Sequence, residues 1–452
     1  MYSINLNFVR KFQLKVIKMD NDNNIKAIIL AAGKGTRMKS ASPKVLHKIF
    51  EKPLLGWVLD SVNNMKVDVD SIVVVGHGAD EVNIFLDKEY KNSASVLQKE
   101  QLGTGHAVAQ AIPLIKNYSG NVLILCGDTP LITTKTLDEF LDFHIDNSSD
   151  ITLMTTVFDN PTGYGRIVRD SNNNLSEIVE QKDATENQKQ IKEVNTGIYL
   201  LNWQKIMPAF SELKNNNAQG EYYLTDIIKW AVNKNLKVSG YIASDNKEIF
   251  GINSRQNLSC ATKIMNERKL DELMTQGVTI VDCASTFISP DTVVMQDTII
   301  YPNTYIEGKN LIKSNCKIGP MTHIRGNCEV GDFCKIGNFV ELKNAKIKNN
   351  TNVCHLSYVG DAELGSNVNI GAGTIFANYN SITKEKKKST LKDGVSIGSN
   401  SVIVAPVELG ENAFTAALSC ITKDVEKDSL AITRCPQKEI KNWVKTKKEK
   451  IK

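Results

Sequence analysis

The sequence predicts an α/β chain in which a mostly parallel sheet domain precedes a parallel β-helix. Two observations predict this order. From Ile25 to about Tyr241, apolar β-branched runs alternate with helical patterns. Between Ile288 and Leu342, every sixth residue is Ile, Val or Leu. A strict period of six suits neither a helix nor an ordinary strand, whereas it suits a β-helix in which each hexad makes a short strand and a turn.

Length and composition limit the class of protein. The 452 residues are enough for two or three domains. The hydrophobic share of 41% and the charged share of 23% are ordinary for a globular protein. No apolar run reaches about 18 residues, so we expect no stable membrane insertion. The net charge of +5 is mild and comes largely from the two basic ends, so we expect no nucleic-acid partner.

The cysteines indicate the compartment. There are nine, with no C-x-x-C pair and no dense framework. They are expected to be reduced thiols of a cytoplasmic protein.

Changes of pattern divide the chain into five segments. Residues 1–18 lack the apolar core of a secretory signal, and a start at Met19 would leave them untranslated. We expect an N-terminal extension at 1–24, a sheet domain at 25–253, a linker helix at 254–276, a β-helix at 277–440 and a basic tail at 441–452.

The sheet domain shows the alternation of strands and helices that is typical of βαβ units, with helices on both faces of the sheet. The expected strands are Ile25–Ala31, Ile72–Val75, Asn121–Leu125 and Ile151–Val157, and the expected helices are Ala79–Leu86, Thr104–Ile115 and the linker helix Ser254–Gln276.

In the β-helix, three hexads are expected to form one coil, with the aliphatic residue pointing to the axis. The period shortens to five before Ile347 and before Leu364, breaks after Phe376 and resumes at Leu391. Glycine follows many of the aliphatic residues, and we expect it to form corners with positive φ. Asparagine is expected to do the same at Asn315, Asn327, Asn338, Asn349 and Asn367.

A glycine-rich turn follows the first strand. Gly33 and Gly35 leave the strand end, and Lys34, Arg37 and Lys44 add positive charge. Such a turn exposes backbone N–H groups that can bind phosphates. It lacks the third glycine of a dinucleotide fingerprint and the G-K-[ST] ending of a P-loop.

Two further segments carry candidate site residues. From Gln98 to Gly105, a loop with Thr104 as expected N-cap leads into a helix, so it could hold a nucleobase or be a plain junction. Asp128 follows a strand at its carboxyl end, where ligands bind in open sheets. It suits Mg²⁺, and a surface turn is the alternative.

The β-helix contains His323 and His355. An imidazole near pKa 6.5 suits proton abstraction at neutral pH, whereas a histidine at a β-helix corner is more often structural. Since a prism offers no cleft of its own, any site would form between neighbouring prisms, which predicts a homotrimer.

These segments resemble a known family. Leu30–Met38 with Pro43–Leu46 is similar to the signature of sugar-1-phosphate nucleotidyltransferases. Together with the β-helix, further segments resemble the bacterial bifunctional N-acetylglucosamine-1-phosphate uridyltransferases and glucosamine-1-phosphate N-acetyltransferases; these are EQLGTGHA (100–107), PTGYGR (161–166), VEQKDA (179–184), NTGI (195–198) and NNNAQGEYYLTDI (215–227). The resemblance covers about residues 25–440. It implies a Rossmann-like nucleotidyltransferase domain and a left-handed β-helix of hexapeptide repeats.

For the first domain, the resemblance implies uridyl transfer from UTP with Mg²⁺. Arg37 and Lys44 are implied to bind the UTP phosphates and stabilise the transition state. The remaining implied roles are UTP binding by Leu30, Ala31, Ala32, Gly33, Gln98, Gly103 and Thr104, metal binding by Asp128 and Asn253, and N-acetylglucosamine binding by Gly165, Glu180 and Asn195.

For the β-helix, the resemblance implies acetyl transfer from acetyl-CoA to glucosamine-1-phosphate, with His355 as general base. Asn380-Ser381 departs from the family's Asp-Gly, whose aspartate helps to orient the base. The implied sugar-phosphate ligands are Arg325, Lys343, Tyr358 and Asn369, and those of acetyl-CoA are Ala372, Asn378, Tyr379, Ser399, Ala417 and Arg434. Asn378 and Tyr379 are also implied to contact the sugar phosphate.

Two alternatives compete with the bifunctional interpretation. A non-catalytic scaffold subunit should have lost Lys44 or Asp128, and neither is lost. A uridyltransferase with a regulatory β-helix should lack His355 together with Arg434 and the Asn378-Tyr379 pair, and all are present.

Overall fold

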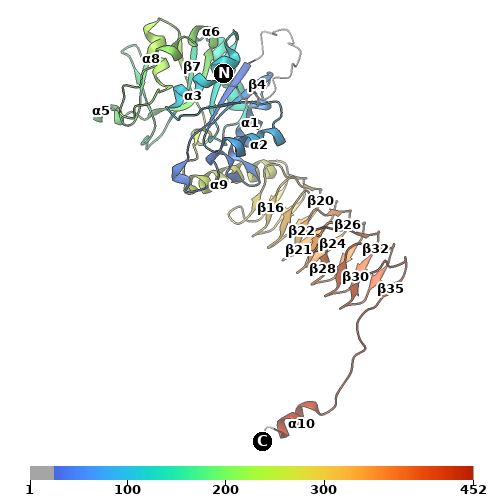
Figure 1. Cartoon of the computed structure of the whole chain (residues 1–452). Helices are drawn as coiled ribbons and strands as arrows, with labels where there is room; N and C mark the ends of the chain where they lie inside the picture. Colours follow the sequence, from blue (N-terminus) through green and yellow to red (C-terminus); the bar gives the residue numbers. More distant parts are fainter. Residues whose placement is uncertain (1–24, 451–452) are drawn as a thin grey trace, which may run out of the picture. The chain divides into compact units, whose positions relative to one another are not determined.

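The computed structural model describes residues 25–450 (Figure 1). The chain divides into two compact units between Ile264 and Met265. We call them the sheet unit and the β-helix unit and describe each by itself. Helix α9 (Arg255–Thr275) contains the point of division. The extension expected at residues 1–24 and the last two residues of the basic tail lie outside the described residues.

The sheet unit is built on one nine-stranded sheet with the order β11-β7-β10-β6-β1-β4-β5, and β8 and β9 pair beside β10. All neighbours along this order are parallel except β10, which is antiparallel to β6 and β7. The strands are β1 (Ile25–Ala31), β4 (Val69–Val75), β5 (Ala94–Leu97), β6 (Asn121–Cys126), β7 (Ile151–Val157), β8 (Arg166–Arg169), β9 (Leu175–Val179), β10 (Glu193–Asn202) and β11 (Val238–Ile242), with a small hairpin of β2 (Lys48–Ile49) and β3 (Lys52–Pro53).

Helices cover both faces of this sheet, as expected (Figure 1). Alternate residues of β1 belong to two separate cores: Ile29 packs on the face of Leu55 and Leu137, and Ile28 on the face of Val108. The helices are α1 (Leu54–Asn63), α2 (Ala79–Glu89), α3 (Thr104–Ile115), α4 (Thr134–Asp146), α5 (Glu186–Lys189), α6 (Trp203–Ile206), α7 (Ala209–Glu212) and α8 (Asp226–Asn233), with 3₁₀ turns η2 (Thr36–Met38), η3 (Lys44–Leu46) and η4 (Asn246–Ile249).

The β-helix unit consists of three parallel sheets of nine, eight and seven strands, in which each strand pairs with the third strand after it or before it along most of the stack. The nine-stranded sheet contains β12 (Thr279–Ile280), β15 (Ile299–Ile300), β18 (Lys317–Ile318), β21 (Lys335–Asn338), β24 (Asn352–His355), β27 (Asn369–Ile370), β30 (Ser396–Ile397), β33 (Phe414–Thr415) and β35 (Leu430–Ala431). The eight-stranded sheet contains β13 (Phe287–Ile288), β16 (Tyr305–Glu307), β19 (His323–Arg325), β22 (Glu341–Lys343), β25 (Tyr358–Gly360), β28 (Ile375–Ala377), β31 (Val402–Val404) and β34 (Cys420–Ile421). The seven-stranded sheet contains β14 (Val293–Val294), β17 (Leu311–Ile312), β20 (Glu329–Val330), β23 (Lys346–Ile347), β26 (Ala362–Leu364), β29 (Ser389–Leu391) and β32 (Val407–Leu409).

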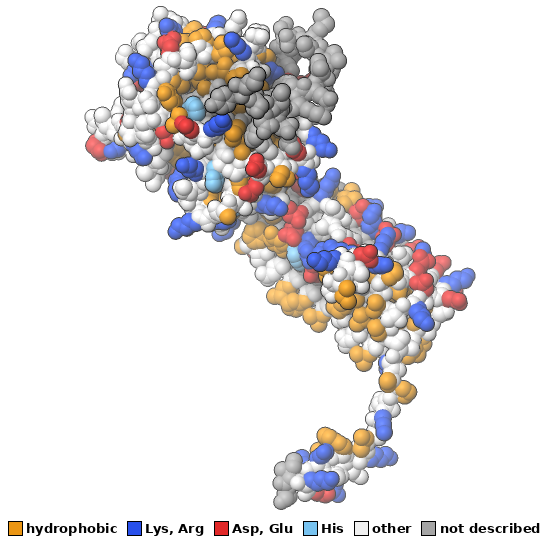
Figure 2. Space-filling model, in the orientation of Figure 1, with side chains coloured by type: hydrophobic (Ala, Val, Ile, Leu, Met, Phe, Trp, Pro, Cys, Tyr) orange, Lys and Arg blue, Asp and Glu red, His pale blue; other side chains and the backbone are white. Residues whose placement is uncertain are grey.

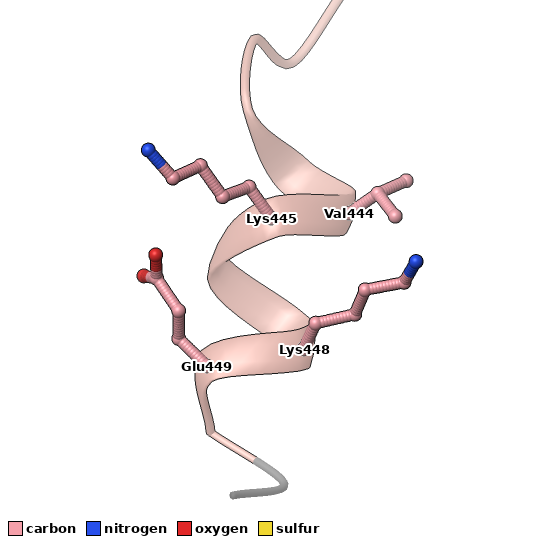
Figure 3. Close-up of a pocket in the computed structure, with 4 residues that line it drawn as sticks. All are labelled: Val444, Lys445, Lys448 and Glu449. Atoms are coloured by element: carbon pink, nitrogen blue, oxygen red, sulfur yellow. The ribbon is translucent and has the colours of Figure 1, made fainter.

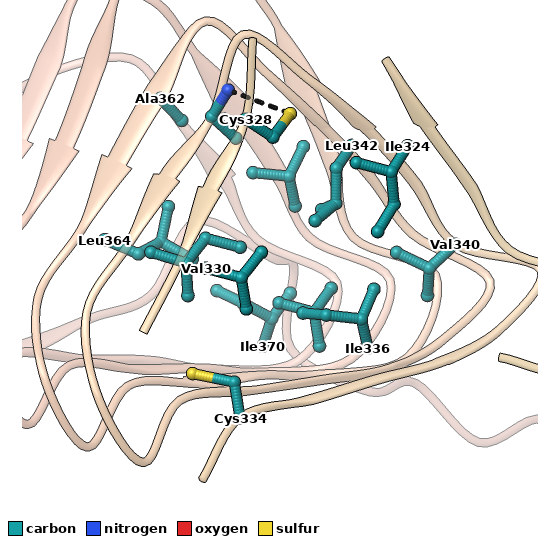
Figure 4. Close-up of a cluster of buried hydrophobic side chains, with 14 of the residues drawn as sticks. Ile324, Cys328, Val330, Cys334, Ile336, Val340, Leu342, Ala362, Leu364 and Ile370 are labelled. Carbon is teal, nitrogen blue, oxygen red and sulfur yellow. Dashed lines mark hydrogen bonds between the residues drawn. The ribbon is translucent and has the colours of Figure 1, made fainter. Parts of the chain in front are cut away.

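The six-residue period builds the core of the prism. Ile324, Val330 and Ile336 come from the three sheets in turn, and their side chains meet at the axis (Figure 4). Each buried aliphatic side chain stabilises the fold by about 1.5–3 kcal/mol. The five-residue steps keep Ile347 and Leu364 buried in the same core. The predicted parallel β-helix of hexapeptide repeats is therefore confirmed.

The buried cysteines of the prism have a structural role. Cys316 Sγ donates to Gly331 O at 3.0 Å, a bond between coils like the one that Thr298 Oγ1 makes to Lys313 O at 2.8 Å. All nine cysteines are free thiols.

The expected reason for the glycines after the aliphatic residues is wrong in most cases. Gly319 has φ 95°, but Gly331 and Gly337 have no positive φ. A Cβ on Gly337 would lie 2.2 Å from Cys354 O in the next coil. These glycines are therefore needed because adjacent coils approach each other closely, rather than because of their backbone angle.

The left-handed corners lie three residues after many of the buried aliphatic residues. Asn315, Asn327 and Asn367 have positive φ, as expected. Asn338 and Asn349 do not, and that expectation is wrong. Asn338 lies inside β21, and Asn349 instead accepts a hydrogen bond from Asp332 N at 3.0 Å.

The last described helix is α10 (Trp443–Glu449), within the expected basic tail. Val444, Lys445, Lys448 and Glu449 surround a shallow hollow on this helix (Figure 3). All four side chains are exposed and come from one helix, so the hollow is not assigned a binding role. Across residues 25–450, no helix combines the length and apolarity that crossing a membrane requires.

Candidate active sites

The glycine-rich turn ends next to Lys44. Gly35 has φ 58°, and a Cβ there would lie 2.7 Å from Lys44 Cβ. Glycine is therefore required both for the backbone angle and for the approach of the lysine stem. Gly33 and Arg37 are exposed, whereas the Lys44 side chain is only 14% exposed.

Backbone hydrogen bonds join the turn to the ends of the neighbouring strands. Leu30 O accepts from Gly127 N at 2.9 Å, and Ala32 O accepts from His77 N at 3.2 Å. Ala31 lies between them and is buried. These bonds hold the turn at the carboxyl edge of the sheet, where open α/β sheets bind ligands.

The predicted metal ligands lie side by side. Ile252 N donates to Asp128 O at 2.9 Å, which brings the following residue, Asn253, next to Asp128. The Lys44 ammonium donates to Asp128 Oδ2 and, at 3.1 Å, to Asn253 Oδ1. One cation thus already bridges the carboxylate and the amide oxygen that the sequence singled out.

This arrangement fits Mg²⁺. The two oxygens converge on a positive charge, and one or two protein oxygens with substrate phosphates are the usual magnesium ligands in phosphoryl-transfer sites. Residues 25–450 contain no cluster of three or more His, Cys, Asp or Glu that could hold a metal. A magnesium site with one carboxylate, one amide oxygen and substrate phosphates does not need such a cluster.

Cys126 lies beside this group. Burial, followed by the charge of Asp128, raises the pKa of its thiol to about 12. The thiol therefore stays protonated at neutral pH.

The loop from Gln98 to Gly105 is joined to the segment that precedes α8. Gly103 has φ 110°, and a Cβ there would lie 2.6 Å from Tyr222 O. Thr104 is not the N-cap of α3, because Gly103 occupies that position. Instead, Thr104 Oγ1 accepts from Leu224 N at 3.1 Å. The expected capping role is wrong because the hydroxyl has a partner from a distant part of the chain.

The three predicted N-acetylglucosamine ligands lie together. A Cβ on Gly165 would lie 3.5 Å from Glu180 Oε1 and 3.6 Å from Asn195 Cβ. Burial raises the pKa of Glu180, and Thr225 donates to its Oε1 at 3.3 Å. Tyr199 Oη donates to Asn195 Oδ1 at 3.1 Å.

Sequence reasoning missed the residues that support this group. Arg166 is 1% exposed and donates to Tyr164 O and, at 2.7 Å, to Gln181 Oε1. Arg166 and Thr225 lie in two of the segments that carry the resemblance, whereas Tyr199 follows NTGI directly. Their polar side chains in otherwise apolar surroundings were the available signal.

On the eight-stranded sheet of the prism, three predicted sugar-phosphate ligands lie on successive strands. Arg325 donates to Glu341 Oε1 at 2.6 Å and pairs with Lys343 in register. Burial and then the Arg325 charge lower the pKa of Lys343. Burial is also the main cause of the raised pKa of Tyr358, whose neighbours include Asn378 and Arg325. Two adjacent cations suit a phosphate.

The loop between β28 and β29 begins next to this cluster. Asn378 donates to Asp361 Oδ2, and Asp361 Oδ1 accepts from Asn344 at 3.0 Å. Tyr379 is 54% exposed, and its backbone forms an isolated antiparallel β-bridge with Lys386. Asn380 Oδ1 accepts from Ile382 N at 2.9 Å within the loop.

His355 and the remaining predicted residues lie elsewhere on the prism. His355 ends β24 in the nine-stranded sheet and is exposed. Ala372, Ser399 and Ala417 are stacked on consecutive coils, because Asn400 N donates to Ala372 O and Leu418 N to Ser399 O. Asn369 lies in the same sheet, and Arg434 is exposed beyond its last strand.

One chain therefore does not unite the predicted acetyl-transfer residues. Arg325, Lys343 and Tyr358 lie on the eight-stranded sheet, whereas Asn369 and His355 lie on the nine-stranded sheet. Within residues 25–450, no hydrogen bond joins the His355 ring to another residue.

The surface of the prism has a charged side and a hydrophobic side. Hydrophobic and charged side chains gather on different sides of the β-helix unit (Figure 2). The seven-stranded sheet carries the ion pairs Lys346–Glu329, Lys388–Glu363 and Lys392–Glu408. Exposed hydrophobic residues lie at the corner after the nine-stranded sheet, which we call the apolar corner; they are Met321, Phe339, Leu356 and Leu418.

Comparison with known proteins connects both units to transferases. Residues 26–249 match the nucleotidyl transferase family, and residues 311–344 match the bacterial transferase hexapeptide (six repeats) family. A curated relative from Clostridioides difficile (strain 630), named bifunctional protein GlmU, is 44% identical over 94% of this chain and 99% of its own length. The bifunctional protein GlmU of Brevibacillus brevis is 43% identical over 91% of this chain and 95% of its own length. The resemblance inferred from the motifs is confirmed: the chain is a two-part transferase that belongs to the bifunctional GlmU family.

Proposed function

We propose that the chain makes UDP-N-acetylglucosamine in two steps. The β-helix unit transfers the acetyl group of acetyl-CoA to glucosamine-1-phosphate. The sheet unit then transfers UMP from UTP to N-acetylglucosamine-1-phosphate and releases pyrophosphate. The product would supply peptidoglycan, lipopolysaccharide and lipid A synthesis, and the enzyme would work in the cytoplasm. The observation that carries the proposal is the convergence of Lys44, Asp128 and Asn253 in a chain of this family.

In uridyl transfer, a phosphate oxygen of the sugar attacks the α-phosphorus of UTP and pyrophosphate leaves. The site has to position anions and neutralise their charge, and no covalent nucleophile is needed. Arg37 and Lys44 would bind the phosphates at the exposed turn after β1, near the backbone of Leu30 to Gly33. Asp128 and Asn253 would hold Mg²⁺, which supplies further positive charge.

Substrate recognition would use the loop from Gln98 to Gly105 and the residues around Glu180. Gln98, Gly103 and Thr104 would hold the uracil. Gly165, Glu180 and Asn195 would hold the N-acetylglucosamine, and their mutual proximity supports a shared role.

In acetyl transfer, the amine of glucosamine-1-phosphate attacks the thioester carbonyl, the C–S bond breaks and the CoA thiolate leaves. His355 would take the amine proton. Arg325, Lys343, Tyr358 and Asn369 would bind the sugar phosphate. The acetyl-CoA ligands would be Ala372, Ser399, Ala417 and Arg434, with Asn378 and Tyr379 between the two substrates.

We propose that this second site is shared by neighbouring chains of a homotrimer. Its residues lie on two faces of the prism, and the apolar corner between these faces suits burial against another copy. Closed symmetric assembly would then bring the two half-sites together.

Two variants test the division of labour. Asp128→Ala should abolish pyrophosphate release from UTP and leave CoA release intact, whereas His355→Ala should do the reverse. Both reactions are measured on the same preparations. CoA release is assayed with glucosamine-1-phosphate and acetyl-CoA, and pyrophosphate release with N-acetylglucosamine-1-phosphate and UTP. Loss of both activities in either folded variant would overturn the assignment. A folded wild-type trimer without CoA release would reduce the function to uridyl transfer alone.

A further inference from the structure

The side-chain amide of Gln98 is held in one orientation. Gln98 is 3% exposed. Its Nε2 lies 3.1 Å from Gly103 O and 3.0 Å from His106 Nδ1. A carbonyl oxygen only accepts, so the amide nitrogen rather than the amide oxygen has to face Gly103. Both N–H groups of the amide are then used inside the protein.

His106 takes the second of these hydrogens, so its Nδ1 is an acceptor and a neutral ring carries its proton on Nε2. Gln110 Nε2 lies 3.1 Å from His106 Nε2 and also 3.1 Å from His106 O. A neutral imidazole accepts at only one nitrogen, so the two glutamines cannot both donate to the ring. The bond to His106 O also keeps the Gln110 nitrogen toward His106, as Gly103 O does for Gln98. Gln110 is half-buried and can rotate its amide away from the ring, whereas Gln98 is only 3% exposed and cannot.

The oxygen of the Gln98 amide remains available to a ligand. No hydrogen bond in residues 25–450 ends on Gln98 Oε1, and this atom is not among the fully buried polar atoms without a partner. The loop therefore offers an acceptor to a base. Uracil presents an N3–H donor that suits an acceptor, whereas cytosine presents a lone pair at N3.

We propose that His106 is a positioning residue that makes the site select uracil over cytosine by holding the Gln98 amide with its oxygen toward the base. This inference rests on the proposed function, because it takes Gln98 as the residue that contacts the base of the nucleotide. His106 itself acts through Gln98. The ring of Tyr222, whose centroid lies 6.4 Å from that of His106, flanks it on one side.

The test compares UTP with CTP as substrates of the full-length protein and N-acetylglucosamine-1-phosphate. His106→Phe keeps a ring but removes the acceptor. We expect the ratio of kcat/KM for UTP to that for CTP to fall about tenfold, the effect of one hydrogen bond, mainly through a higher KM for UTP. His106→Asn can place an oxygen near the position of Nδ1 and should keep most of the discrimination. The tryptophan fluorescence of the sheet unit, which contains Trp57, Trp203 and Trp230, checks that each variant is folded.

An equal loss of kcat/KM for both nucleotides in His106→Phe would overturn the inference, because a purely structural role would not change the ratio. Failure of the proposed function gives different results. In that case, the wild type would transfer neither nucleotide, or Gln98→Ala would discriminate as well as the wild type does.

Discussion

The two units assemble their candidate sites in opposite ways. In the sheet unit, loops from several strand ends converge, so Lys44 contacts both Asp128 and Asn253 within one chain. In the β-helix unit, strands stack without converging, and Arg325 and Asn369 lie on different sheets. A twisted sheet concentrates functional groups at one edge, whereas a prism distributes them over flat faces. The difference teaches that the first site should be complete in a single chain and the second should need another copy.

The largest expected effect comes from separating the chains. Phe339→Asp places a charge at the apolar corner, and aspartate tolerates the φ of 58° found there. We expect dissociation of the proposed trimer and a loss of CoA release of about a hundredfold or more, because the reacting groups are no longer held together. Pyrophosphate release should persist. Sedimentation and the two assays measure these outcomes.

Phe333 is the matched control for that experiment. It is 58% exposed, compared with 57% for Phe339, and has φ 59°, but it lies at a different corner, after the seven-stranded sheet. Phe333→Asp should leave both the assembly and CoA release unchanged. Full CoA release by a monomeric Phe339→Asp variant would contradict the comparison.

Acid should weaken the sheet unit through His144. Burial lowers the pKa of this side chain from 6.5 to about 4. Below pH 6.5 the unfolded chain takes up a proton on His144 and the folded chain does not. The stability that neutral His144 gives the fold is therefore complete above pH 6.5 and is lost as pH falls toward 4. The loss in free energy of unfolding reaches about 3 kcal/mol, at about 1.4 kcal/mol per pKa unit.

Tryptophan fluorescence during urea unfolding measures this effect in one unit. Trp57, Trp203 and Trp230 all belong to the sheet unit, and Trp443→Phe removes the remaining signal. In the His144→Leu variant, the free energy of unfolding should change much less between pH 6.5 and pH 4 than in the wild type. An equally steep dependence in that variant would assign the acid sensitivity to another group.

The smallest expected effect concerns the cation that joins Asp128 and Asn253. Lys44→Met removes a competing charge, so Mn²⁺ should bind about fivefold more tightly without nucleotide, equivalent to about 1 kcal/mol. Electron paramagnetic resonance of free Mn²⁺ measures this. Lys34→Met, in the same turn but exposed, should change little. Weaker binding in Lys44→Met would mean that the lysine supports the metal instead of competing with it.

Local patterns predicted the elements well. The strands Ile25–Ala31 and Ile151–Val157 and the helix Thr104–Ile115 have the expected bounds. The period of six predicted the prism because each inward position has the same neighbours in every coil. The convergence of Asp128 and Asn253 followed from the resemblance and agrees with the geometry.

The errors share one cause, which is contact between residues far apart in sequence. Thr104 was expected to cap its own helix, but its hydroxyl instead accepts a hydrogen bond from Leu224 N. Gly337 was expected to supply a backbone angle, but Cys354 O in the next coil leaves no room for a side chain. A single sequence shows which residue types are unusual at a position, whereas it does not show which distant atom makes them necessary.

The loop between β28 and β29 leaves the stack without disturbing it. Leu364 pairs with Leu391 across the whole loop, as Ile347 pairs with Leu364 across an ordinary coil. Segments added or removed here would therefore not change which strand pairs with which. The tip of the loop, between Tyr379 and Lys386, can therefore be lengthened or shortened by a protein engineer while the strand pairing of the prism stays the same.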